Sequence, residues 1–189
     1  STSPFAITAL SSDPDARLVN GENYTVLVRA ASAAGTGAAS APRILSPRAV
    51  PAQTVTSLTP LDGGVSVAFS VADDGGSPIL DMQYSLNGSA FVSTGSLSSP
   101  FVLTGLPNGQ AASLQLRAVN VSGAGAASET RSATPRTVPG APTAVTVVAD
   151  NARALVAWAA PTTDGGASIS HYTATAYATA SSTTPIAAC

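Results

Sequence analysis

Charged side chains, cysteine and aromatic residues are all scarce in this chain of 189 residues. Charged residues account for 10% of the sequence, against about 25% in ordinary globular domains, and the formal net charge is -2. Because Lys and Arg do not cluster anywhere, the chain lacks the positive surface that binding to nucleic acid requires. We therefore expect no nucleic-acid partner.

The single cysteine, Cys189, cannot close a disulfide within the chain or build a multi-cysteine metal site. Its thiol either stays free or forms an intermolecular disulfide with a cysteine outside this chain, and the sequence leaves both alternatives open. The longest apolar run, 154–160, is far shorter than the roughly 20 residues of a membrane-spanning helix. We therefore expect no membrane insertion in this segment.

The residue patterns that support catalysis or cofactor binding are missing as well. The only histidine, His171, has no associated nucleophile motif, and the phase of its neighbours places it on the outer face of a strand. The acidic residues fall at expected turns or strand edges and do not form a pair across a cleft. The Gly-x-Gly segments 35–37 and 123–125 lie between strands, with no helix start to face a phosphate. We expect no enzyme activity and no cofactor.

An internal repeat organises the residues that are present. Segment 20–40 recurs as 108–128, and each residue lies 88 positions before its counterpart. A second pair of segments, 50–79 and 138–169, shares Val-Pro, an aromatic residue and Asp-Gly-Gly in the same order. The chain is therefore built from units of about 90 residues.

Within each repeat the hydrophobic pattern has a period of two. Apolar residues alternate with small or polar ones along 24–28, 65–71 and 82–86, which predicts half-buried strands. The alanine-rich stretch 30–41 is interrupted by Gly and carries no helical stripe, so we expect turns and edge strands there. Asn87-Gly88 lies between two alternating runs and predicts a type I′ hairpin turn. Short strands joined by turns predict antiparallel β-sandwiches.

Several residues of the C-terminal part stand in a characteristic order. They are Pro139-Gly140-Ala141-Pro142, Trp158, Asp164-Gly165-Gly166, Ile169 and Tyr172. This order resembles the first half of a fibronectin type III domain, of the Ala-, Gly- and Thr-rich kind found in bacteria. The stretch from Asn20-Gly21 through Tyr24 to the Gly-x-Gly segment resembles strands E to G of the same family, with Tyr24 as its corner tyrosine. The resemblance implies an all-β fold of tandem fibronectin type III, immunoglobulin-like sandwiches.

The resemblance also implies which aromatic residues form the core. These are Phe69, Trp158, Tyr24 and Tyr172. The middle repeat departs from the family, because Phe69 replaces the core tryptophan and Ala112 stands where the first repeat has Tyr24. A tyrosine corner supplies a packed ring and a hydrogen bond, each worth on the order of 1 kcal/mol. We therefore expect the middle sandwich to be less stable than a typical member.

Three parts follow from this alignment. Residues 1–47 correspond to strands E to G of one domain, 48–136 to a complete domain, and 137–189 to strands A to C′ of another. Three explanations stay open: an excerpt from a longer array, one period of a repeating chain, or a subunit whose end segments complement neighbouring copies head to tail. The last would be a heterologous contact related in logic to strand donation.

The segment 11–19 is an insertion relative to the second repeat, and it holds the weak candidates for a metal site. Asp13 and Asp15 could supply two oxygen ligands to Ca²⁺, which takes six to eight, so a solvated loop is the simpler interpretation. Asp73-Asp74 and Asp164 precede Gly-Gly pairs, where carboxylates usually accept backbone hydrogen bonds in turns. We expect no metal at those turns.

The function that this sequence favours is a non-catalytic spacer, stalk or fibre-forming repeat, extracellular or at the cell surface. Its expected partners are neighbouring copies or flanking repeats of the same array. One alternative is an accessory linker region of a secreted polysaccharide-degrading enzyme. Another is an adhesion or phage-tail module that binds a cell-surface or glycan ligand through its loops, although few exposed aromatic residues are available for stacking on sugars.

Overall fold

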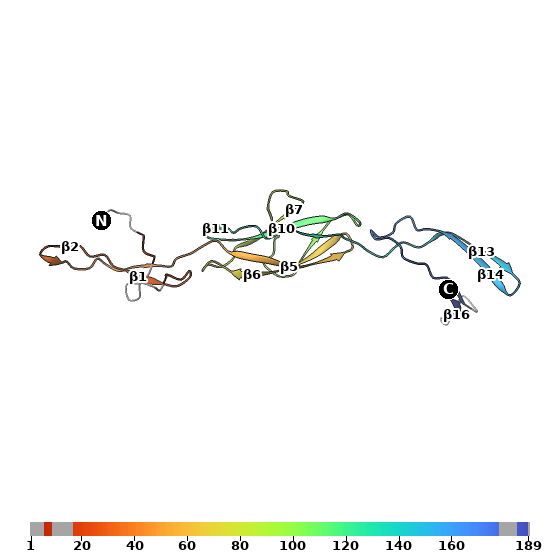
Figure 1. Cartoon of the computed structure of the whole chain (residues 1–189), viewed down its shortest axis with the longest axis horizontal. Helices are drawn as coiled ribbons and strands as arrows, with labels where there is room; N and C mark the ends of the chain where they lie inside the picture. The colour runs from red at the N-terminus through yellow and green to blue at the C-terminus, as the bar shows by residue number, and fades with distance from the viewer. Residues whose placement is uncertain (1–5, 9–16, 178–184, 189) are drawn as a thin grey trace. The chain divides into compact units, whose positions relative to one another are not determined.

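The computed structural model describes residues 6–8, 17–177 and 185–188 (Figure 1), and for the last stretch only the backbone is described. None of the described residues is helical, and every strand pair with a described register is antiparallel. The strands are β1 (Tyr24–Val26), β2 (Ala31–Ser32), β3 (Gly35–Thr36), β4 (Arg43–Leu45), β5 (Ala52–Leu61), β6 (Gly64–Asp73), β7 (Asp81–Leu86), β8 (Val92–Ser93), β9 (Phe101–Thr104), β10 (Ala112–Asn120), β11 (Gly123–Ala124), β12 (Arg131–Ala133), β13 (Thr143–Asp150), β14 (Arg153–Ala159), β15 (Thr175–Tyr177) and β16 (Pro185–Ala188). The predicted all-β class is confirmed.

The middle of the chain forms two sheets. One has the strand order β5-β6-β9, and the other has the order β11-β10-β7-β8, with β12 also paired to β10. In chain order β5 to β10 take the places A, B, C, C′, E and F, and β11 and β12 together take the place G. A, B and E thus share one sheet, and C′, C, F and G share the other. The fold is therefore a fibronectin type III-like sandwich, as the resemblance implied.

The period-two pattern of the sequence accounts for the core of this sandwich. Burial alternates along the whole of β10, and β6 buries its apolar residues from Val65 to Phe69 in the same way. The buried apolar side chains are Val55, Val65, Val67, Phe69, Met82, Phe101, Ala112, Leu114, Leu116 and Ala118. Alternation places these residues on one face of each strand. That face is buried between the two sheets, because removing apolar side chains from water is favourable.

The turn between β7 and β8 has the predicted geometry. Asn87 and Gly88 have φ values of 51° and 76°, and the amide of Ser89 donates to the carbonyl of Leu86 at 3.0 Å. Positive φ at both central residues is the requirement of a type I′ turn, which Asn-Gly meets with little strain. The predicted hairpin turn is confirmed.

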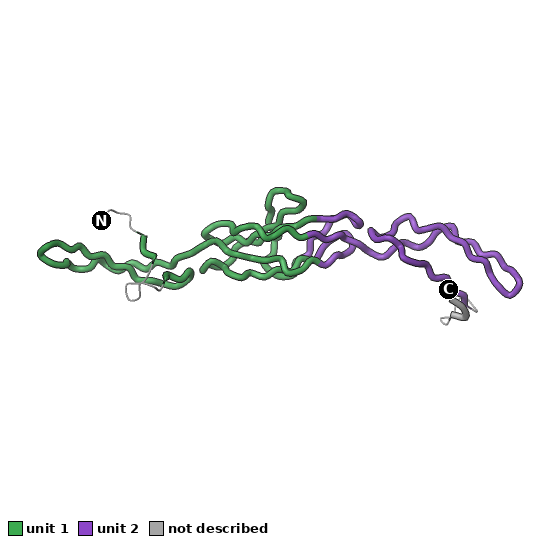
Figure 2. The backbone as a smooth tube through the Cα atoms, viewed as in Figure 1, with its two compact units in different colours: residues 1–58, 67–101, 113–131 green, residues 59–66, 102–112, 132–189 purple. Residues whose placement is uncertain are grey.

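The described structure divides into two compact units, and the division passes through the sandwich (Figure 2). Unit 1 contains residues 1–58, 67–101 and 113–131, and unit 2 contains 59–66, 102–112 and 132–189. Each unit thus joins one part of the sandwich to one flanking segment. The domain limits predicted from the repeat, near residues 47 and 136, stay predictions.

In unit 1, the N-terminal segment forms a hairpin. β1 pairs with β4 from Tyr24↔Leu45 to Val26↔Arg43, and the alanine-rich stretch forms the small hairpin β2-β3, as expected of turns and edge strands. The hydroxyl of Tyr24 accepts a hydrogen bond from the amide of Val19 at 2.8 Å. A tyrosine bonded to backbone a few residues upstream is the corner motif of these sandwiches. In the middle sandwich its counterpart Ala112 is buried but has no such group.

Replacing Tyr24 with phenylalanine should expose the Val19 amide to exchange. The substitution removes the acceptor and keeps the ring, so it should cost about 1 kcal/mol, which corresponds to roughly fivefold faster exchange. Hydrogen exchange followed by NMR measures this directly. The amide of Gly37, bonded to the carbonyl of Ala30 at 2.8 Å, serves as the internal reference and should not change. Unaltered exchange at Val19 would contradict the role assigned to Tyr24.

In unit 2, the C-terminal segment forms two separate hairpins. β13 pairs with β14, with an irregularity between Thr143 and Thr146, and β15 pairs with β16. By the repeat in the sequence these strands correspond to β5 to β8 of the middle sandwich, and their assignment to strands A to C′ of a further domain stays a prediction. Every residue of β13 and β14 is exposed. Among the described residues there is no helix long and apolar enough to cross a membrane.

Candidate functional site

The calcium candidates Asp13 and Asp15 and the thiol of Cys189 lie outside the described residues, so these assignments stay predictions. Within the described part of the chain, no group of three or more His, Cys, Asp or Glu side chains could hold a metal ion. His171 is exposed, and the hydroxyl of Ser170 lies 3.0 Å from its Nδ1. The predicted position of His171 on the surface is confirmed.

Three aspartates that precede Gly-Gly pairs cap turns, as the sequence indicated. Each uses its Oδ1 to accept a hydrogen bond of 2.8 Å from a backbone amide two residues later. The three bonds run from Gly75 to Asp73, from Gly76 to Asp74 and from Gly166 to Asp164. These carboxylates therefore hold the loops between β6 and β7 and after β14 in shape.

Of the four predicted core aromatics, Tyr24 is half-buried in the hairpin of unit 1, and the other three fall into two groups. Phe69 is buried and lies against Phe101, with ring centroids 6.1 Å apart. Trp158 and Tyr172 also pack on each other, with centroids 5.4 Å apart, but they remain 38% and 36% exposed. The described C-terminal strands form only two hairpins and supply no E, F or G strand to cover these rings. Phe69 thus occupies a core position, whereas Trp158 and Tyr172 lie on an uncovered face.

Outside the core, the structure contains a pair of equivalent junctions. The first junction comprises Asn20-Gly21, the linker 47–49 and Gly75-Gly76, all in unit 1. The amide of Gly21 donates to the carbonyl of Pro47 at 2.9 Å, and the amide of Ala49 donates to the carbonyl of Gly75 at 2.8 Å. These two bonds tie a loop of the N-terminal segment and a loop of the sandwich to the same short linker.

The second junction comprises Asn108-Gly109, the linker 135–137 and Gly165-Gly166, all in unit 2. The amide of Gly109 donates to the carbonyl of Pro135 at 2.9 Å, and the amide of Thr137 donates to the carbonyl of Gly165 at 2.8 Å. Both bonds match those of the first junction in atoms and in length. The repeat in the sequence therefore specifies a repeat in how successive sandwiches are joined.

Glycine is required at both junctions because two backbones touch there. A Cβ on Gly21 would lie 3.1 Å from the Cα of Gly76, and a Cβ on Gly109 would lie 3.1 Å from the Cα of Gly166. A Cβ on Gly76 would overlap the backbone nitrogen of Gly21. All four glycines also have φ values between 75° and 88°, which side-chain-bearing residues rarely adopt.

A buried asparagine reinforces the first junction. Asn120, only 3% exposed, donates through its Nδ2 to the carbonyls of Ala49 at 2.8 Å and Asp74 at 2.7 Å, while its Oδ1 accepts from the amide of Ser122. Near the second junction, Asn108 donates to Asp62 at 2.8 Å and accepts from the amide of Gly63 at 2.9 Å. The Asn120 bonds hold the first linker at a defined place on the sandwich, and the Asn108 bonds tie its loop to the turn between β5 and β6.

The sequence pattern contained these junctions without identifying them. Asn20-Gly21 and Asn108-Gly109 mark the repeat in the sequence, whereas the aspartates before the Gly-Gly pairs predict only turns. The glycines and the linkers recur together in both repeats. This recurrence could have indicated the junctions, because glycine at the same place in each repeat is typical of a close approach between backbones. Which loops touch could be known only from the tertiary structure.

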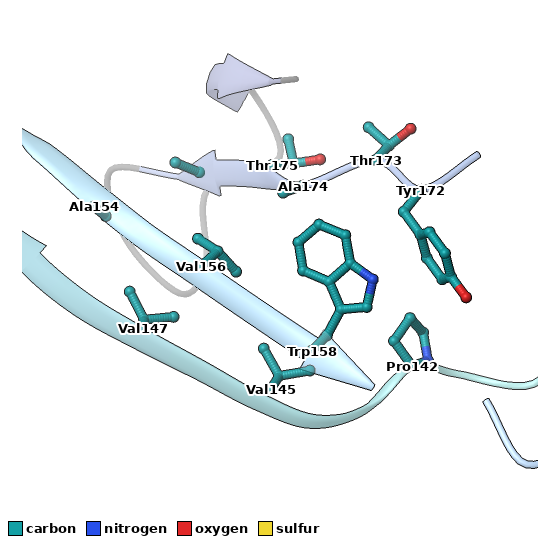
Figure 3. A pocket seen from close by; sticks show the side chains of 11 residues that line it. Pro142, Val145, Val147, Ala154, Val156, Trp158, Tyr172, Thr173, Ala174 and Thr175 are labelled. Carbon is teal, nitrogen blue, oxygen red and sulfur yellow. The ribbon is translucent and has the colours of Figure 1, made fainter. Parts of the chain in front are cut away.

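A second feature of unit 2 is an open apolar face, defined by Val145, Val147, Val156, Trp158 and Tyr172. Figure 3 shows the indole of Trp158 projecting from β14 towards Tyr172, with the valines of β13 and β14 beside it. The groove between these side chains is open to solvent, and valine and aromatic carbon dominate it. Contiguous exposed apolar surface of this kind usually marks a contact with another protein segment.

Charge near this face is confined to one turn. The amide of Asn151 and then the guanidinium of Arg153 hold the pKa of Asp150 below its ordinary value. The Nε of Arg153 lies 2.6 Å from Oδ2 of Asp150, at the tip of the β13-β14 hairpin. Both side chains are solvated, so the pair helps to close the turn and contributes little to stability.

Comparison with known proteins gives no match to a family model and no match to a curated protein. Among solved structures, the sixth fibronectin type III domain of human fibronectin type III domain containing protein 3 is similar at 17% identity, over 51% of this chain and 97% of that one, with a TM-score of 0.40. Chicken CNTN1 FN1-FN3 domains are 20% identical over 64% of this chain and 44% of that one, with a TM-score of 0.37. A three-domain segment of titin is 15% identical over 49% of this chain and 35% of that one, also with a TM-score of 0.37. The strand order of the two sheets identifies the fold.

Proposed function

We propose that this chain is a non-catalytic structural spacer, in which sandwiches are joined in series to form part of a stalk or fibre. One observation carries the proposal, namely the glycine junction that recurs with the same hydrogen bonds in unit 1 and unit 2. A linker that only tethers two domains needs no such repeated contact. A spacer that must hold its domains at a set angle does need it.

The proposed rigidity has a physical basis, because the linker has little conformational freedom. Proline in the linkers limits the backbone, and the two amide bonds of each junction fix the short stretch that remains. Side-chain bonds from Asn120 add a second set of contacts to the first linker. Domains joined by a small interface normally move relative to each other. The prolines and hydrogen bonds of the junction restrict that hinge motion.

We further propose that the spacer works outside the cell or at its surface, with neighbouring copies or flanking repeats as partners. The low charge and the many Ser, Thr and Gly residues give a neutral, hydroxyl-rich surface. Such a surface has little electrostatic attraction for nucleic acid or for charged membranes. This composition and the resemblance to bacterial repeat arrays support the location.

The rigidity of the first junction is measurable by ¹⁵N relaxation. If the junction is stiff, the amides of residues 17–47 and 67–100 should have the same rotational correlation time, because both belong to one rigid body. Amides of the exposed hairpin turn at Gly88 provide a reference for local motion. A markedly shorter correlation time for 17–47 would overturn the proposed role as a spacer of defined geometry.

A further inference from the structure

We propose that the open apolar face of unit 2 binds the N-terminal segment 17–45 from a second copy of this chain, which completes a sandwich between the two molecules. The proposal deepens the structural role proposed above, on which it rests, by naming the partner of the open face. The middle sandwich of the same chain provides the template.

The open face corresponds to positions that are buried in the middle sandwich. Trp158 aligns with Phe69, Val156 with Val67, and Tyr172 with Met82 in the two copies of the repeat. In the middle sandwich, Phe69, Val67 and Met82 are 8%, 0% and 1% exposed. Their counterparts are between 36% and 40% exposed, although their side chains are also largely apolar. The face is therefore a core surface that lacks its cover.

Strand β10 shows what covers this surface in the middle sandwich. It pairs with β7 in the register Met82↔Ala118, Tyr84↔Leu116 and Leu86↔Leu114. Leu114, Leu116 and Ala118 are all buried there. A strand that fits the open face must therefore present two branched apolar residues and then alanine at alternate positions.

This chain carries the same sequence pattern a second time, beginning in β1 and running beyond its end. The residues 88 positions before Leu114, Leu116 and Ala118 are Val26, Val28 and Ala30. Val28 is 67% exposed, so its side chain is available for burial. Within the described residues β1 pairs with β4 alone, whereas β10 pairs with β7, β11 and β12. Segment 17–45 thus has apolar residues to bury and a strand edge to pair.

The template predicts the register of the contact. Tyr172 should pair with Ala30, and the next pairs on the same face are residue 174 with Val28 and residue 176 with Val26. The large residue again faces alanine, as Met82 faces Ala118. On the outer face, the Nε of Arg117 donates to Gln83 Oε1 at 2.7 Å, and the corresponding pair is Arg29 with the hydroxyl of Thr173.

A contact of this kind joins different surfaces of the two molecules. Each copy offers one open face and one donor segment, so every contact leaves a further face and a further segment for other copies. Such heterologous contacts extend into open assemblies unless a rotation closes them. The same logic governs donated strands that complete an immunoglobulin-like partner.

Disulfide trapping between two single-cysteine variants tests the register. Thr173→Cys and Arg29→Cys are made in separate chains in a Cys189→Ser background, mixed and oxidised. Paired antiparallel residues have Cα atoms about 4.5 to 5.5 Å apart, within the range that a disulfide spans. We expect a heterodimer in about tenfold greater yield than from Thr173→Cys mixed with Thr25→Cys, because residue 25 lies four positions, or roughly 13 Å, along the strand.

Further variants separate the possible outcomes. Val28→Asp in the donor chain should abolish the cross-link without moving the unfolding midpoint of the middle sandwich, since Val28 is exposed in the single chain. Equal yields from the matched and shifted pairs would overturn the proposal. So would cross-linking of a Thr173→Cys, Arg29→Cys double variant within one chain at high dilution, which would mean that the chain's own segment covers the face. The proposed function is tested separately in the Val28→Asp variant, where the correlation times of 17–47 and 67–100 are compared without this contact.

Discussion

Replacing Leu116 with alanine should lower the free energy of unfolding of the middle sandwich by about 2 to 5 kcal/mol. Leu116 is fully buried in the centre of β10. Its backbone accepts from the Nε2 of Gln53 at 3.0 Å and from the amide of Ser128 at 2.7 Å, and these bonds do not involve the deleted atoms. The loss therefore measures packing, because the substitution leaves a cavity in a closely packed core.

Urea unfolding followed by circular dichroism gives the change, with Val102→Ala as the matched control. Val102 lies on β9 and is 53% exposed, so its truncation should cost no more than about 0.5 kcal/mol. Similar losses for both variants would mean that the two sheets do not enclose Leu116. If the free energy of unfolding depends less steeply on urea concentration in Leu116→Ala alone, the substitution changes the compactness of the native or unfolded state as well as the stability.

Replacing Gly76 with alanine should open the first junction. The Cβ would overlap the backbone of Gly21, and the φ value of 75° adds strain of about 1 to 2 kcal/mol. The two loops must separate, because neither side of the overlap is a side chain that can move away. We expect the amides of Gly21 and Ala49, which bond within the junction, to exchange at least about tenfold faster.

Gly105→Ala is the control for backbone strain. Gly105 has a φ value of 76°, yet a Cβ there would meet nothing within 4 Å. Both variants share the conformational cost, so the difference between them isolates the overlap with Gly21. The same effect of both substitutions on the Gly21 amide would refute a close-packed junction. Gly166→Ala should act in the same way on the second junction, through Gly109.

The fold class, the repeat and the local turns could be predicted from the sequence because short-range rules decide them. Period-two alternation places the residues of β10 on opposite faces wherever the strand lies. Asn87-Gly88 forms its turn because both residues tolerate positive φ, and the Tyr24 hydroxyl reaches a backbone amide only five residues away. Each of these features depends on a few neighbouring residues.

Buried polar contacts were not predictable in this way. Gln53 lies on the inner side of β5, where the pattern would favour an apolar residue, and it is 8% exposed. Its amide donates to the carbonyls of Leu116 and Ala126 at 3.0 and 2.8 Å and accepts from the amide of Ala118 at 3.0 Å. These partners are more than 60 residues away in the chain, and only the packed fold brings them within reach.

Sequence alone therefore determined that this protein is a repeated, antiparallel, low-charge β-sandwich protein, because composition and periodicity act locally. The tertiary structure decided which aromatic residues are covered. Phe69 and Trp158 occupy equivalent positions in the sequence, yet one is buried and the other is 38% exposed. The structure also decided that Gly21 meets Gly76, and Gly109 meets Gly166. Burial and backbone contact depend on which distant strands and loops come together, and no local pattern contains that information.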